Sequence, residues 1–213
     1  MEKNTRYILL DRLRAANPTP ATELNWMTPF ELLTAVMLSA QTTDVRVNQA
    51  MGKLFPVANT PAAILALGEE KLKEYIRAVG LYNRKAEHLL KICALLTERH
   101  DGKVPREREA LEALPGVGRK TANILLNTLY GEPTIAVDTH VFRVSNRTGF
   151  APGKDVRVVE EQLHSVTPEE FKKNVHHWLV LHGRYVCTAK KPKCGQCVIL
   201  DLCDRVLAPG ALE

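Results

Sequence analysis

The sequence of 213 residues predicts an all-α fold. Apolar residues recur at intervals of three and four along most of the chain, as they do on the buried face of a helix. Several helix starts are marked by a threonine followed by proline, in two cases with glutamate three positions after the threonine, and two others by an aspartate. No segment alternates polar and apolar residues over the length of a strand. Together these observations favour helices joined by short, capped turns.

The chain begins with one amphipathic helix and one that should be buried. Residues 5–16 have a leucine-rich face among charged residues, and a proline-containing turn ends this helix. Thr28 is placed as an N-cap, with Pro29 at the first helical position and Glu31 as the capping-box glutamate. Residues 32–38 are apolar on nearly every face, which predicts the central core helix.

Three further helices are predicted before residue 100. A polar turn at residues 39–44 precedes an amphipathic helix at 45–55, and the simplest role for the threonines and the aspartate of this turn is helix capping. Thr60 and Pro61 start another helix. An apolar stripe at residues 86–96 includes Cys93, which we interpret as a small buried hydrophobic residue.

A Pro-Gly-x-Gly turn lies between two helical segments, 106–113 and 121–130. Gly116 and Gly118 allow a very tight turn and leave backbone N–H groups uncovered where the second helix starts. Such groups, with the positive end of the helix dipole, suit a phosphate. The run Gly-Arg-Lys-Thr is not a Walker A loop, because that motif places glycine directly before lysine and follows a strand. A plain loop between helices remains the alternative interpretation.

Three more helices follow. Asp138 is placed as the N-cap of a helix that ends near Thr148, and the preceding apolar run at 135–137 is too short to argue for a sheet. Asp155 and the capping box at 167–170 open the other two. The apolar face of the last helix contains Phe171, Val175, Trp178, Leu179 and His182.

The charge and the cysteines limit the class of protein. The net charge of +5 favours a polyanionic partner. The charged start leads into no long apolar run, so we expect no signal peptide and no membrane association. A cytoplasmic, nucleoid-associated protein is predicted. In that reducing compartment, five cysteines indicate ligation of a metal or cluster rather than disulfides.

Four cysteines are spaced as Cys-x6-Cys-x2-Cys-x5-Cys. Four thiolates within 17 residues can bind one centre. Zinc sites usually have two close pairs of cysteines, whereas this motif has one close pair and two single cysteines, which favours a 4Fe-4S cluster. Ligation would supply folding energy to a segment too short to form its own core. The predicted ligands are Cys187, Cys194, Cys197 and Cys203.

Basic residues surround the first of these cysteines. Lys190, Lys191 and Lys193 lie in the six-residue interval, and Arg184 lies just before it. Such charges repel one another and are typical of a solvated loop. If a cluster anchors the loop, they form a fixed phosphate-binding surface in which each contact adds affinity and salt dependence.

Three motifs together resemble the endonuclease III family of DNA base-excision glycosylases. The run Leu114–Ala122 is similar to the family's helix-hairpin-helix, Val-Asp-Thr-His at 137–140 matches a second motif, and the cysteine spacing matches the cluster loop. The resemblance extends from Pro29 to Cys203. It implies two helical lobes with a cleft between them.

The family's organisation implies where the lobes begin and end. Residues 22–132 would form a helical, barrel-like domain with the helix-hairpin-helix. Residues 1–21 and 133–213 would form a discontinuous helical iron-sulfur domain, with its cluster loop at 187–203.

The resemblance also implies the roles of two residues. Lys120 would be the nucleophile and Asp138 its essential partner; a phosphate contact is the commoner use of a lysine at such a turn. A lysine attacks as the neutral amine, a form that the adjacent Arg119 and the positive end of the helix both favour. We expect Asp138 to stabilise cationic sugar character and to shuttle a proton.

Further residues are implied to contact DNA. The run Ser-Ala-Gln-Thr-Thr-Asp resembles a family stretch whose glutamine helps to wedge the duplex open, a role that falls to Gln41. Leu81 resembles the second wedge residue, although an apolar residue packed under a turn is an equal alternative. The other expected contacts are Gly116, Gly118, Arg119, Arg184, Lys190, Lys191 and Lys193.

The function that this resemblance implies is DNA repair. The enzyme would remove oxidised or ring-saturated pyrimidines as an N-glycosylase, then nick 3′ to the abasic site by β-elimination through a lysine Schiff base. Its partner would be double-stranded DNA containing damaged bases or abasic sites, bound by a monomer. One alternative is a mismatch adenine glycosylase-like enzyme, which typically has an additional C-terminal domain and no lysine at the hairpin. The other is a non-catalytic or redox-sensing helix-hairpin-helix DNA-binding protein.

Overall fold

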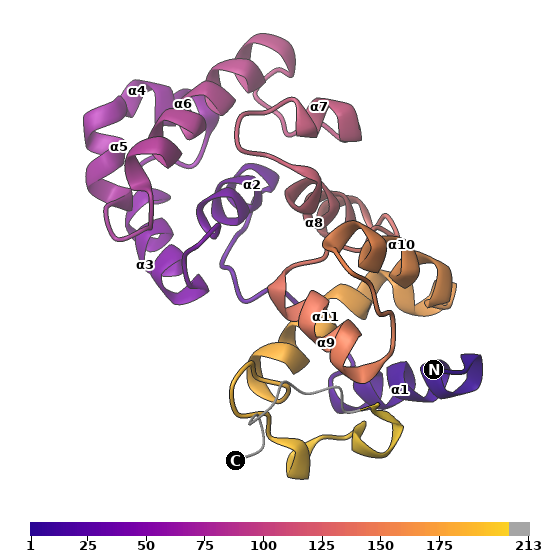
Figure 1. The fold of residues 1–213 in the computed structure, drawn as a ribbon. Coiled ribbons are helices and arrows are strands. Elements are labelled where there is room, and N and C mark those ends of the chain that lie inside the picture. Colours follow the sequence, from indigo (N-terminus) through magenta and orange to yellow (C-terminus); the bar gives the residue numbers. More distant parts are fainter. Residues whose placement is uncertain (205–213) are drawn as a thin grey trace. The chain divides into compact units, whose positions relative to one another are not determined.

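The structure is a computed structural model that describes residues 1–204 (Figure 1). These residues form eleven α-helices and two short 3-10 helices and contain no strand, so the all-α prediction is confirmed. None of the described helices is both long enough and apolar enough to cross a bilayer. The chain divides into two compact units, Thr22–Tyr130 and Met1–Ala21 with the chain from Gly131 onward.

The Thr22–Tyr130 unit is arranged around α2. Nine of the ten residues of α2 are buried, and α3, α6 and α8 pack against it, which confirms the predicted core helix. The helices of this unit are α2 (Pro29–Leu38), α3 (Asp44–Leu54), α4 (Pro61–Leu67), α5 (Glu69–Ile76), α6 (Tyr82–Arg99), α7 (Arg108–Glu112) and α8 (Arg119–Tyr130).

The start of α2 differs from the predicted capping box in one contact. The hydroxyl of Thr28 accepts from the backbone N–H of Glu31 at 3.2 Å, as predicted for an N-cap. The Glu31 carboxylate, however, accepts from the N–H of Met27 at 2.7 Å, one residue before the cap. It also accepts from Asn59 at 3.2 Å, so the buried glutamate joins the start of α2 to the loop before α4.

Two other features of this unit bear on the predictions. Cys93 is fully buried, and burial raises the pKa of its thiol to about 12, which confirms its interpretation as a core residue. Thr43 occupies the N-cap position of α3, but its side chain makes no capping hydrogen bond, so the capping prediction for this turn is wrong for Thr43. The neighbouring Thr42 instead uses its hydroxyl to accept from Gly80 and Lys85.

The second unit is arranged around α11. This helix packs against α9 and α1, and all five residues of its predicted face are buried. The elements of this unit are α1 (Lys3–Ala16), α9 (Thr139–Thr148), α10 (Val156–Val166), α11 (Glu169–Tyr185), η1 (Cys194–Gln196) and η2 (Leu200–Leu202).

Two of the three predicted helix starts in this unit are confirmed. Asp138 accepts from the N–H of Val141 at 2.8 Å, and Asp155 accepts from two N–H groups of α10 at 3.0 Å. The capping box at Thr167 is wrong, because Pro168 occupies the N-cap position of α11 and Thr167 ends α10. The Thr167 hydroxyl is buried and has no hydrogen-bond partner within the described residues.

Candidate functional site

The helix-hairpin-helix consists of α7, α8 and the turn between them, and the residues of this turn alternate between core and surface. Leu114 and Val117 are 3% and 4% exposed, so they anchor the turn on the hydrophobic core. Gly116 and Gly118 are exposed. The N–H of Val117 donates to the carbonyl of Leu114 at 3.0 Å, which closes the turn.

The two glycines serve different purposes. Gly116 has a φ of 79°, a left-handed conformation that favours glycine. A Cβ at this position would lie 2.7 Å from Nδ1 of His88, so a larger residue would also clash with that side chain. A Cβ at Gly118 would meet nothing within 4 Å. The space above Gly118 leaves the amides that start α8 accessible to a phosphate.

Lys120 is the second residue of α8. Its side chain is exposed, as is that of Arg119 at the first position. Backbone N–H groups at the start of a helix lack partners inside the helix, and the helix dipole is positive there. The turn therefore presents uncovered amides, a guanidinium and a primary amine on one small surface.

Asp138 lies in the other unit, at the start of α9. Its hydrogen bond to Val141 holds the partly buried carboxylate at the N-terminus of the helix. His140 follows on the first turn, and burial lowers its pKa despite the opposing effect of Asp138. Arg143 contacts His140 at 3.2 Å and donates to the carbonyl of Gly183 at 2.7 Å, so it joins α9 to α11.

The predicted cluster ligands all line one small cavity. It lies beyond the end of α11, and its other lining residues include Arg147, His182 and Leu200. No group of three or more His, Cys, Asp or Glu side chains among residues 1–204 is arranged around a single metal ion. A four-iron cluster binds one cysteine at each iron and needs a wider arrangement than one ion does. A shared cavity lined by four thiols suits such a cluster.

Arg147 holds the cluster loop and was not predicted. Its guanidinium is buried and donates to the carbonyls of Thr188 at 2.8 Å and Ala189 at 3.1 Å. It also approaches Sγ of Cys187 at 3.6 Å, where it can neutralise thiolate charge. The only signal in the sequence was its spacing of three from Val144, which places an arginine on the buried face of α9.

The basic loop is fixed at both ends. The N–H of Lys193 donates to the carbonyl of Val186 at 2.9 Å, and the Thr188 hydroxyl donates to the carbonyl of Lys191 at 2.6 Å. The side chains of Lys190, Lys191 and Lys193 are exposed. The structure thus groups these lysines on a defined loop next to the cysteine cavity, while Arg184 lies half-buried on the last turn of α11.

Gln41 and Leu81 lie on two turns of the Thr22–Tyr130 unit that are bonded to each other. Both residues are exposed, Leu81 by 59%, so the alternative of an apolar residue packed under a turn is wrong for Leu81. Both have left-handed backbones, with φ of 55° and 57°. The N–H of Gly80 donates to the hydroxyl of Thr42 at 3.1 Å and joins the turns.

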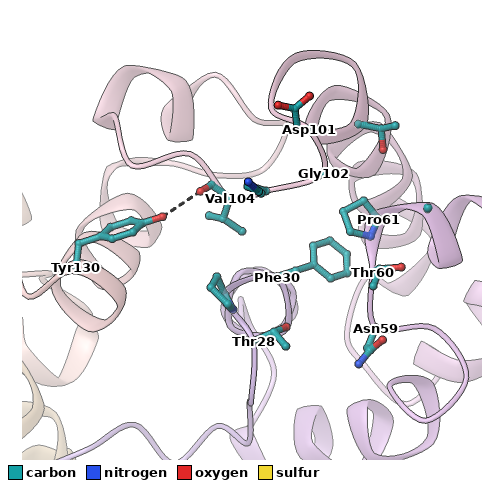
Figure 2. Close-up of a pocket in the computed structure, with 13 residues that line it drawn as sticks. Thr28, Phe30, Asn59, Thr60, Pro61, Asp101, Gly102, Val104 and Tyr130 are labelled. Carbon is teal, nitrogen blue, oxygen red and sulfur yellow. Dashed lines mark hydrogen bonds between the residues drawn. The ribbon is translucent and has the colours of Figure 1, made fainter.

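A separate cavity of about 890 Å³ lies in the same unit where α2 and α4 begin (Figure 2). Phe30, Pro61 and Val104 give it an apolar lining, and the Tyr130 hydroxyl at its edge donates to the carbonyl of Val104 at 3.0 Å. None of the predicted catalytic, DNA-binding or cluster residues lines this cavity, so it is not part of the predicted site.

Comparison with protein families gives two matches. The model for the HhH-GPD superfamily of base excision DNA repair proteins matches residues 34–169. The model for the iron-sulfur binding domain of endonuclease III matches residues 187–203. The second match confirms that the four-cysteine loop is an iron-sulfur site and not a zinc site.

Individual relatives match over nearly the whole chain. Endonuclease III of Escherichia coli (strain K12) and that of Haemophilus influenzae are each 64% identical over 204 residues, which are 96% of this chain and 97% of each relative. A solved structure of an endonuclease III trapped as a covalent intermediate with DNA is 44% identical. It has a TM-score of 0.90 and covers 96% of this chain and 97% of that chain.

Proposed function

Since the chain belongs to the HhH-GPD superfamily of base excision DNA repair proteins, in its endonuclease III family, we propose that it is a bifunctional DNA glycosylase and abasic-site lyase. The observation that carries this proposal is the position of Lys120. Its exposed amine lies at the first turn of α8, next to a hairpin whose amides suit a phosphate. A relative 44% identical to this chain has been trapped as a covalent intermediate with DNA, which requires a nucleophile of this kind.

Lys120 is the proposed nucleophile. Its neutral amine attacks C1′ of the damaged nucleotide, the N-glycosidic bond breaks, and the base leaves with the bonding electrons and accepts a proton. Opening of the sugar ring gives an imine between Lys120 and C1′. Loss of a proton from C2′ then expels the 3′ phosphate, and the strand is cut by β-elimination.

Asp138 is the proposed partner of this amine. A carboxylate stabilises the cationic sugar that forms as the base departs, as carboxylates do in glycosidases. It also accepts and returns protons during ring opening. The N-cap hydrogen bond to Val141 orients the carboxylate before DNA binds, which supports a preorganised role.

The cysteine loop is proposed to hold DNA rather than to take part in the bond-breaking steps. Cys187, Cys194, Cys197 and Cys203 would hold a 4Fe-4S cluster, whose ligation supplies folding energy to this segment. The exposed lysines of the loop, with Arg184, would then bind phosphates. The alternating burial of the hairpin supports phosphate contacts at Gly116, Gly118 and Arg119.

Gln41 and Leu81 are the proposed wedge residues. Both are exposed on adjoining turns, where they can enter a duplex and fill the space left by an everted nucleotide. Damaged bases stack and pair poorly, so they are everted at lower cost. We propose oxidised or ring-saturated pyrimidines as substrates, and a monomer that acts on the nucleoid in the cytoplasm.

Reductive trapping tests the proposal. Duplexes with a ring-saturated pyrimidine or an abasic site are incubated with the protein and borohydride, which converts an imine into a stable bond. The wild-type protein should form a covalent adduct and nick the strand, and Lys120→Gln should do neither. The exposed Lys103→Gln variant is the matched control and should behave as wild type.

The same experiment separates the alternatives. A non-catalytic DNA-binding protein would bind the duplex without forming an adduct. A mismatch adenine glycosylase-like enzyme would release adenine from a mismatch without a Lys120 adduct. Either result, obtained with protein that retains its cluster, would overturn the proposal.

A further inference from the structure

Lys85, near the start of α6, is a buried cation. The residue is only 5% exposed, and burial lowers the pKa of its ammonium group. Its Nζ donates to the carbonyls of Leu38 at 2.8 Å and Ala40 at 2.5 Å, and to the hydroxyl of Thr42 at 3.1 Å. An ammonium has three donors, and these contacts use all of them. Leu38 ends α2, so the charge also lies at the negative end of that helix dipole.

The contacts of Lys85 fix the turn that presents Gln41. Ala40 and Thr42 are the residues immediately before and after Gln41, and both are bound by the one ammonium. Gln41 itself has a φ of 55°, a left-handed conformation that costs energy in any residue with a side chain. Such a conformation persists only when the surrounding contacts enforce it, and here Lys85 provides two of them.

Lys85 is also bonded to the turn that presents Leu81. Its backbone N–H donates to the carbonyl of Leu81 at 3.1 Å. The Thr42 hydroxyl that accepts from Lys85 also accepts from the N–H of Gly80. The turns pack closely, because a Cβ at Gly80 would lie 3.1 Å from the carbonyl oxygen of Gln41. One residue therefore connects both turns through its backbone and its side chain.

We infer that Lys85 is a positioning residue that sets the placement of Gln41 relative to Leu81 for opening duplex DNA. The inference rests on the proposed function, in which these two side chains enter the duplex. Lys85 is buried beneath the turns and acts through them. It differs in this from the basic residues of the hairpin and the cluster loop, which are proposed to contact phosphates directly.

An eversion assay tests this inference without requiring chemistry. A duplex places 2-aminopurine next to an uncleavable abasic analogue, and its fluorescence rises when the stack opens. Lys85→Met removes all three hydrogen bonds of the ammonium and should lower the equilibrium rise at least about tenfold, which is the effect of losing one charge-assisted hydrogen bond. Nicking of single-stranded abasic DNA, which needs no duplex opening, should stay near the wild-type rate. Lys91→Met is the control, because Lys91 is exposed on the same helix and pairs with Glu87 at 2.6 Å.

Thr42→Val is a milder second variant, since it removes only the hydroxyl shared by Lys85 and Gly80. It should lower eversion in the same direction and leave the melting temperature close to that of wild type. In a Gln41→Ala, Leu81→Ala background, Lys85→Met should have no further effect on eversion, because the residues that it positions are gone.

Three results would overturn the inference. The first is a wild-type fluorescence rise in Lys85→Met, and the second is an equal loss of duplex opening and single-strand nicking in that variant. The third is a full additional effect of Lys85→Met in the background without Gln41 and Leu81. Failure of the proposed function is distinct from all three. In that case wild-type protein would form no borohydride adduct, while the fluorescence assay would still report whether Lys85 controls eversion.

Discussion

Asp138 has a structural and a proposed chemical task, which two substitutions can separate. Its carboxylate caps α9 through Val141. Asparagine caps a helix about as well as aspartate but has no negative charge, whereas alanine lacks the acceptor as well. The pair Asp138→Asn and Asp138→Ala therefore distinguishes loss of charge from loss of the cap.

We expect Asp138→Asn to lower single-turnover base release on the order of 10²-fold or more, the usual contribution of an acid–base group. Its free energy of unfolding should stay near that of wild type. Asp138→Ala should lose a similar amount of activity and also about 1 kcal/mol of stability. Urea unfolding and base-release rates measure the two effects, and full activity in Asp138→Asn would leave the carboxylate with only its capping role.

His177 gives the protein a dependence of stability on pH. Burial on α11, assisted by the neighbouring His176, lowers its pKa to about 4, and its Nδ1 has no hydrogen-bond partner in the described part of the chain. An unfolded histidine binds a proton near pH 6.5. Between pH 6.5 and 4, His177 is therefore protonated in the unfolded state and neutral in the folded state. The free energy of unfolding falls as the pH falls through this range.

We expect the free energy of unfolding to drop by about 2 kcal/mol between pH 7 and pH 5 because of this one residue. His177→Gln should lose that much less over the same interval. His100→Gln, at the partly exposed end of α6, is the control and should follow wild type. Equal pH profiles for wild type and His177→Gln would show that His177 titrates normally in the folded protein.

Residues whose partners are distant in sequence were the ones that sequence reasoning missed. Arg147 binds carbonyls about forty positions away, and Lys85 binds a turn more than forty positions away. Neither belongs to a local motif, and a charged residue in a helix ordinarily indicates a solvated face. Only the packing of α9 against α11, or of α2 against α6, brings these cations to their acceptors.

At the scale of an element, the two glycines of the helix-hairpin-helix have different roles. Gly116 adopts a left-handed conformation against His88, while the space above Gly118 is open. Gly116 is needed for folding of the turn, and Gly118 is proposed to allow the close approach of DNA. The same substitution at the two positions should therefore have different consequences.

We expect Gly116→Ala to lower the free energy of unfolding by at least about 1–2 kcal/mol, the cost of a left-handed conformation for a residue with a Cβ. Gly118→Ala should change stability by less than about 0.5 kcal/mol. It should weaken binding of abasic duplex DNA, since its methyl group would obstruct a phosphate. Thermal unfolding and fluorescence anisotropy measure the two effects, and wild-type affinity in Gly118→Ala would exclude close approach at this residue.

Element boundaries show where local patterns suffice. Thr28, Asp138 and Asp155 cap their helices as predicted, because each precedes one helix and does not directly follow another. Thr167 lies between two helices and could end one or begin the next; the structure uses it to end α10. The helix start predicted at Thr60 and Pro61 likewise did not reveal that Gly68, with φ of 78°, divides this segment into α4 and α5.

At the scale of the whole molecule, the family and the iron-sulfur loop were predictable because the motifs that define them are short and contiguous. The catalytic pair was not fixed by such a pattern. Lys120 belongs to the Thr22–Tyr130 unit and Asp138 to the other, so no local spacing determines whether they act together. Their proposed joint role rests on family resemblance, and the Lys120 and Asp138 variants described above test it.

Electrostatic attraction acts over the whole protein, which has a net charge of +5. If the cluster loop binds phosphates, replacing Lys190, Lys191 and Lys193 by glutamine should reduce the slope of log K against log salt by up to about 2.7, since each phosphate contact contributes about 0.9. The same change at the exposed Lys3, Lys53 and Lys103 alters the net charge equally and should have a smaller effect. Equal slopes for the two triple variants would refute a specific role of the loop.

The discontinuous unit also has a consequence during synthesis. Leucines 9, 10 and 13 of α1 are buried against helices that follow residue 131, including α11. At about 5–20 residues per second, the ribosome needs on the order of ten seconds to make the intervening chain. During that time the apolar face of the nascent α1 helix stays exposed to solvent. The Thr22–Tyr130 unit can fold without α1, because its hydrophobic core contains no residue of that helix. Chaperone capture during translation should therefore concentrate on the first helix and cease once α11 has emerged.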